Sequence, residues 1–117
     1  MLAHVLLEDK LPSDTLWQEP LTSSRLLEYE VWTRIRARGL ARSHGRALIG
    51  RVALIELEPP VLARALEPFP IPVRTLDALH LASIEFLRVR RQTVELASYD
   101  QRLVAAARAL RIPLYAL

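Results

Sequence analysis

The chain contains two kinds of apolar pattern. Some segments are short, continuous apolar runs, and others have apolar residues at the spacing of a helix. The runs at Leu21–Ser23, Val52–Leu57, Thr93–Ser98 and Ile112–Tyr115 are short and bounded by turn residues or prolines, so each predicts a strand. Between them, apolar residues recur three and four positions apart, as in amphipathic helices. Strands separated by helices pair in parallel, so the pattern predicts an α/β fold whose sheet is covered on both faces.

The longest helical stretches have recognisable ends. Leu27, Val31 and Ile35 form one stripe, which predicts a helix capped by Ser23 or Ser24 that runs to about Arg38. Gly39 is expected to end it. Further helices are predicted over Leu2–Leu7, Ala41–Arg51, Val61–Leu66, Leu76–Arg91 and Gln101–Leu110.

One carboxylate is expected inside the core. Asp77 lies in the first turn of a helix that is apolar on most sides, with Thr75 as the expected cap. An unpaired buried carboxylate is costly. The helix dipole offsets part of that cost and a bound cation would offset more, although Asp77 could also serve only as a capping residue.

Composition narrows the class of protein. The 117 residues are half hydrophobic and contain no cysteine, which predicts a single domain over residues 1–117 without disulfides or thiolate metal sites. No apolar run approaches the roughly 20 residues that span a bilayer, and the first residues lack the basic start of a signal peptide. We therefore expect a cytoplasmic protein with no membrane partner.

Arginine supplies almost all of the positive charge. The net charge is +3, Lys10 is the one lysine, and arginines gather between Arg34 and Arg51. Arginine favours phosphate contacts, which makes nucleic acid a candidate partner, but a compositional bias or a solvated face explains the same pattern. The candidate nucleic-acid-binding residues are Arg34, Arg38, Arg42 and Arg46.

Three acids could form a metal site. Asp77 and Asp100 each stand at the start of a helix, Asp100 directly after a predicted strand, and Glu30 lies beside the apolar stripe, whereas Glu28 points elsewhere. Carboxylates without cysteine suit Mg²⁺ or Mn²⁺, which can promote phosphodiester hydrolysis. The alternatives are an N-cap role for Asp100 and an ion pair of Glu30 with Arg34.

Other reaction classes have less support. His80 could bind a metal but could equally be a histidine at the edge of the core. The sequence has no Gly-rich phosphate loop, no G-x-S-x-G and no H-E-x-x-H, which argues against nucleotide-loop enzymes, serine hydrolases and zinc proteases.

Three segments together resemble the PIN domain, in particular the VapC-like toxin ribonucleases of type II toxin–antitoxin systems. The segments are a serine-led helix bearing a Glu (Ser23–Val31), an L-D-A-x-H-x-A helix start (Arg74–Ala82) and a strand ending in S-Y-D before a helix (Leu96–Leu103). The resemblance covers nearly the whole chain and implies a three-layer α/β/α fold with a short parallel sheet.

The resemblance also implies an activity and its residues. Glu30, Asp77 and Asp100 would be catalytic acids that hold Mg²⁺ or Mn²⁺ for endonucleolytic hydrolysis of RNA, and Ser98 would lie at the edge of the site. Members of this group usually form homodimers and are silenced by a cognate antitoxin protein.

The chain departs from the family pattern at its start. The family begins with a central strand and a D-T/S-S motif that supplies a first acid, whereas Leu2–Leu7 resembles the helix that follows that motif. We therefore expect an N-terminally truncated PIN-like domain of marginal stability or activity. A non-catalytic module that binds an antitoxin-like partner is the alternative, and a phosphatase-like α/β enzyme is disfavoured because it too needs an aspartate after a first strand.

Overall fold

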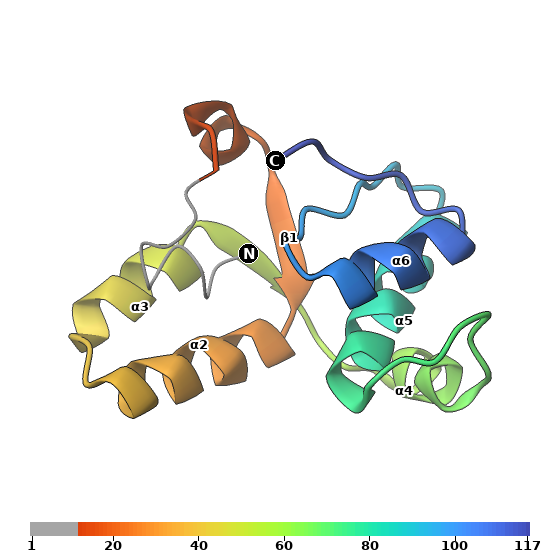
Figure 1. The fold of residues 1–117 in the computed structure, drawn as a ribbon, viewed down its shortest axis with the longest axis horizontal. Coiled ribbons are helices and arrows are strands. Elements are labelled where there is room, and N and C mark those ends of the chain that lie inside the picture. Colours follow the sequence, from red (N-terminus) through yellow and green to blue (C-terminus); the bar gives the residue numbers. More distant parts are fainter. Residues whose placement is uncertain (1–11) are drawn as a thin grey trace. The chain divides into compact units, whose positions relative to one another are not determined.

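The computed structural model describes residues 12–117, so the predicted helix at Leu2–Leu7 and the question of a preceding strand lie outside the described residues. The described chain divides into two compact units, residues 12–56 and 57–117 (Figure 1). The first unit holds the 3-10 helix η1 (Asp14–Gln18), β1 (Leu21–Ser24), α2 (Leu26–Arg38), α3 (Arg42–Ile49) and β2 (Val52–Ile55). The second unit holds α4 (Pro59–Leu66), α5 (Thr75–Val89) and α6 (Gln101–Ala109).

The first unit contains a parallel sheet. Strands β1 and β2 pair in parallel, with Leu21 opposite Val52 and Ser24 opposite Ile55. Parallel neighbours need a crossover connection, and α2 and α3 supply it (Figure 1). The predicted α/β class is thereby confirmed. The sheet has two strands within residues 12–117, so the full α/β/α layering remains a prediction.

Helices α2 and α3 pack around the hydrophobic core of the first unit. Val31 and Ile35 are 2% and 3% exposed, as the apolar stripe predicts, and both tryptophans pack against them. Gly39 ends α2 with φ 63°, a left-handed conformation that glycine adopts without strain. Gly45 is buried where α3 meets α2, and its lack of a side chain leaves room for the Ile35 and Trp32 side chains of α2.

The second unit has its own core, built from α5, α6 and the last residues. Leu81, Leu103, Ala107 and Ile112 are buried together. Helix α4 packs on α5, and Arg64 of α4 donates from Nε to Glu85 Oε2 of α5 at 2.5 Å. The helices predicted at Val61, Leu76 and Gln101 are thus confirmed, with small shifts of their ends. No helix within residues 12–117 is both long and apolar enough to cross a membrane.

The two predicted C-terminal strands are wrong as strands. Leu96 and Leu114 form a single parallel bridge, in which Leu96 N–H donates to Pro113 and Tyr115 N–H donates to Leu96. Pro113 has no N–H, so it cannot extend the ladder on its own side. Apolar runs of this length predict extended backbone correctly, but a strand also needs a continuous partner.

The predicted helix caps also differ from those observed. The backbone is still extended at Arg74, which takes the cap position with ψ 165°, and Thr75 is already helical. Ser24 still belongs to β1, so Arg25 makes the transition into α2. Neither cap residue makes a side-chain cap hydrogen bond.

Candidate active site

Asp77 is buried at the start of α5. Its side chain is 11% exposed and lies in the first turn, where the free backbone N–H groups favour negative charge. Arg74 Nε approaches Asp77 Oδ2 at 3.4 Å from the preceding turn. The carboxylate therefore has a cationic partner, as the physical cost of burying it requires.

Asp100 caps α6 with one of its two oxygens. Oδ1 accepts from the backbone N–H of Arg102 at 2.9 Å and of Leu103 at 3.3 Å, which confirms the capping alternative. Oδ2 is turned to Arg74, whose terminal nitrogen lies 3.2 Å away. The capping role uses Oδ1 and leaves Oδ2 for a cation.

Ser98 fixes the backbone beside this acid. Its hydroxyl accepts from the backbone N–H of Asp100 at 3.0 Å, and both residues are half-buried. The hydrogen bond closes the tight turn that brings the chain from the Leu96 bridge to the start of α6. Ser98 therefore positions Asp100, which is a defined role for a residue expected only at the edge of the site.

Arg74 joins the two aspartates, a role that is not among those predicted from the sequence. One guanidinium contacts Oδ2 of Asp77 and Oδ2 of Asp100, which are far apart in sequence. The spacing from Arg74 to Asp77 is the i,i+3 spacing of a helical ion pair, which was the available signal. The Arg74 side chain is 61% exposed, so it can move aside. The two carboxylate oxygens that it contacts are hard ligands of the kind that bind divalent metal ions.

Glu30 lies in the other unit. It is half-buried on α2, and its membership of the site stays a prediction. No three histidine, aspartate or glutamate side chains within residues 12–117 are arranged as a metal-binding group. In the described residues, Arg74 thus brings together two of the three predicted acids, Asp77 and Asp100. His80 is half-buried one turn after Asp77, a position that suits a metal ligand and a core-edge histidine alike.

Glu28 has a structural role at the start of α2. Arg25 donates to Glu28 at 3.2 Å and also pairs with Glu56, which follows β2. Hydrogen bonds to the Glu56 and Glu28 carboxylates hold the pKa of the Arg25 guanidinium above its ordinary value. This ion-paired cluster ties the start of α2 to the end of β2.

The four candidate nucleic-acid-binding arginines all lie in the first unit. Arg34 and Arg38 lie on α2, Arg42 and Arg46 lie on α3, and all four are exposed. Arg42 stacks its guanidinium on the Trp32 ring at 4.7 Å, and Arg51 stacks on Trp17 at 4.8 Å. Exposure and stacking are compatible with a phosphate-binding face without establishing one.

Comparison with known proteins identifies the family. The chain is 35% identical over 94 residues to Ribonuclease VapC46 of Mycobacterium tuberculosis (strain ATCC 25618 / H37Rv), and the match covers 80% of this chain and 71% of that relative. No protein-family model and no solved structure matches the chain. At this identity and coverage, the chain belongs to the VapC ribonuclease family.

Proposed function

We propose that this chain is a PIN-type endoribonuclease that hydrolyses RNA phosphodiesters with Mg²⁺ or Mn²⁺. The observation that carries the proposal is the convergence of Asp77 and Asp100 on one guanidinium. Two carboxylates that share one cationic side chain are suited to sharing a divalent ion. The relationship to Ribonuclease VapC46 supports the nuclease class.

Each residue has a defined task in this proposal. Asp77 and Asp100 would hold the ion, and Glu30 would complete the acidic set. When bound, such an ion would lower the pKa of a water molecule and offset charge on the phosphate. Ser98 fixes the Asp100 backbone, and Asp77 lies in the first turn of α5, where free backbone N–H groups are favourable neighbours for a carboxylate.

The proposal includes two protein partners. As a VapC-type nuclease, the chain is expected to bind a cognate antitoxin that blocks RNA cleavage, and to form a homodimer. Light scattering after size-exclusion chromatography tests the dimer against the 13.3 kDa mass of one chain. Co-expression with the neighbouring gene product, followed by a cleavage assay, tests the antitoxin.

The central experiment is cleavage of a labelled RNA with Mg²⁺, with Mn²⁺ and with EDTA. We expect cleavage with either ion and none with EDTA. Asp77→Asn preserves shape but removes charge, and should lower the rate by orders of magnitude while the circular dichroism spectrum stays unchanged. Arg108→Gln, an exposed substitution on α6, is the control for an unrelated surface change.

Two results would overturn the proposal. Cleavage that persists in EDTA would show that the reaction needs no metal ion. Full activity of the Asp77→Ala, Asp100→Ala double variant would show that neither aspartate takes part in catalysis. If the double variant and the wild type are both inactive but bind the antitoxin equally, the chain is a binding module instead.

A further inference from the structure

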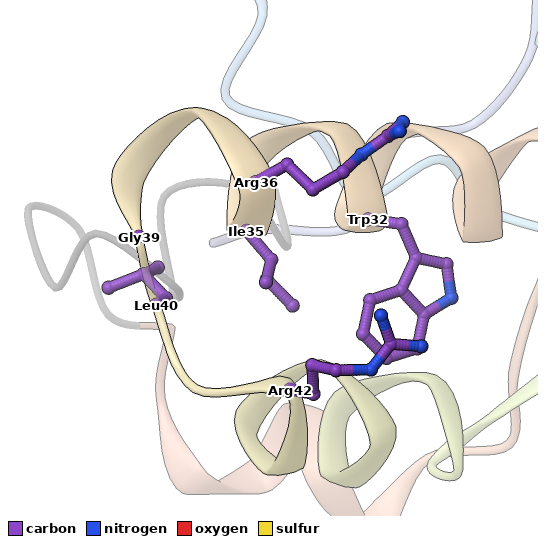
Figure 2. Close-up of a pocket in the computed structure, with 6 residues that line it drawn as sticks. All are labelled: Trp32, Ile35, Arg36, Gly39, Leu40 and Arg42. Atoms are coloured by element: carbon purple, nitrogen blue, oxygen red, sulfur yellow. The ribbon is translucent and has the colours of Figure 1, made fainter.

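A pocket of about 440 Å³ opens where α2 ends and α3 begins (Figure 2). It lies wholly within the first unit and is separate in sequence from Asp77 and Asp100. Two of its lining residues are arginines, one is tryptophan and none is acidic. The lining residues are Trp32, Ile35, Arg36, Gly39, Leu40 and Arg42.

One side of the pocket is a flat stacked platform. The Arg42 guanidinium lies 4.7 Å from the centre of the Trp32 ring, and Figure 2 shows the two groups together while Ile35 projects into the space beside them. Ile35 is 3% exposed and gives the pocket an apolar floor. Guanidinium and indole faces both stack well on other flat π systems.

The surroundings of the pocket are strongly basic. From Val31 to Ile55 the sequence contains no aspartate or glutamate, yet it contains six arginines. Elsewhere in the described chain, Arg25, Arg64 and Arg74 each pair with a carboxylate. The six arginines of this segment are Arg34, Arg36, Arg38, Arg42, Arg46 and Arg51.

We propose that this pocket, formed wholly by residues of the first unit, is a nucleotide-binding subsite for single-stranded RNA. A base stacks on the Trp32–Arg42 platform, and Arg36 and Arg42 contact the adjoining phosphates. The choice of RNA among polyanions rests on the proposed ribonuclease function. An acidic peptide could use the charges but has no need of a flat aromatic platform.

The test is RNA binding in EDTA, where metal-dependent cleavage cannot occur. Trp17→Phe leaves Trp32 as the one tryptophan, so its fluorescence reports on the pocket. A uridine hexanucleotide should quench this fluorescence, and Trp32→Leu should weaken binding of the labelled hexanucleotide about tenfold, as expected for loss of one stacked base. Because Trp32 also packs on the core, thermal unfolding checks that this variant folds.

The arginine variants separate a site from diffuse charge. Arg36→Ala and Arg42→Ala should each weaken binding and reduce the slope of log affinity against log salt by about 0.7 per lost phosphate contact. Trp32→Leu should leave that slope unchanged because it removes no charge. Arg108→Ala removes the same charge from exposed α6 and should change affinity little.

Each remaining outcome has one meaning. Wild-type affinity in Arg42→Ala, or an equal loss in Arg108→Ala, overturns the subsite, as does a wild-type chain that binds an acidic peptide but no RNA. Metal-dependent cleavage by a chain whose Trp32 and Arg42 variants bind normally would refute the subsite alone. Pocket-dependent RNA binding without any cleavage would support the subsite and refute the nuclease.

Discussion

At the scale of single residues, Asp100 shows how one carboxylate can serve the fold and the site together. Its Oδ1 atom caps α6, while its Oδ2 atom faces the Arg74 guanidinium. Capping and metal binding are alternatives when only the sequence is considered, but the separate positions of the two oxygens make them compatible. The two roles can therefore be separated by substitution.

Asp100→Asn should separate them. Asparagine caps helices about as well as aspartate, so the free energy of unfolding in EDTA should hardly change, whereas Asp100→Ala should lose about 1 kcal/mol. Both variants should bind Mn²⁺ at least roughly tenfold more weakly. Loss of a residue that only supports a metal ligand already costs about tenfold to hundredfold in affinity, and Asp100 is proposed as a ligand itself. Urea unfolding and calorimetric titration measure the two effects, and wild-type Mn²⁺ affinity in Asp100→Asn would exclude this carboxylate as a ligand.

Arg74 competes with the proposed metal ion for the same oxygens. Arg74→Gln removes the competing charge, so calorimetry should show tighter Mn²⁺ binding. Without metal, the variant should lose at most about 1 kcal/mol of unfolding free energy, because the arginine side chain is largely exposed. Arg108→Gln, which removes an equal charge from α6, should leave Mn²⁺ affinity nearly unchanged. Weaker Mn²⁺ binding in Arg74→Gln would show that Arg74 supports the site instead.

At the scale of elements, the packing of α2 on α3 depends on Gly45. A Cβ at this position would collide with the buried Ile35 side chain and lie 3.1 Å from the Trp32 ring. Gly45→Ala should lower the free energy of unfolding by about 1–3 kcal/mol through overpacking, despite the better helix propensity of alanine. Gly39→Asn is the control, since asparagine accepts the left-handed conformation and no atom lies within 4 Å of the new Cβ. An unchanged urea midpoint in Gly45→Ala would mean that Ile35 moves aside at little cost.

The helices were predictable because their signals are local. The stripe from Leu27 to Ile35, the stop at Gly39 and the cap at Asp100 are all set by residues within a turn or two. The strand at Thr93–Ser98 failed because strand formation depends on a distant partner, and Pro113 limits that partner to one bridge. The residues of one strand do not reveal that its partner segment has a proline, which lacks an N–H, at a position where the ladder needs a donor.

The acids of the candidate site could be predicted from the sequence, but the ion pairs that join distant residues could not. Burial of Asp77 follows from the apolar residues around it, and the structure shows it. The link from Arg74 to Asp100 joins residues 26 positions apart, which no local pattern reports. Arg25 likewise reaches Glu56 across 31 positions and so explains why Glu28 belongs to a structural cluster.

At the scale of the whole molecule, the proposed function predicts that the bound metal ion stabilises the folded chain. A ligand that binds only the folded chain raises stability by about 2.7 kcal/mol at a hundred times its dissociation constant, so saturating Mn²⁺ should raise the unfolding midpoint. Glu30→Gln should reduce this rise because it removes a proposed ligand. Glu28→Gln should weaken only the Arg25 cluster, lowering the midpoint equally with and without Mn²⁺. Differential scanning fluorimetry compares the wild type and both variants with and without Mn²⁺, and a Mn²⁺ response lost in Glu28→Gln but kept in Glu30→Gln would assign the metal to the other face of α2.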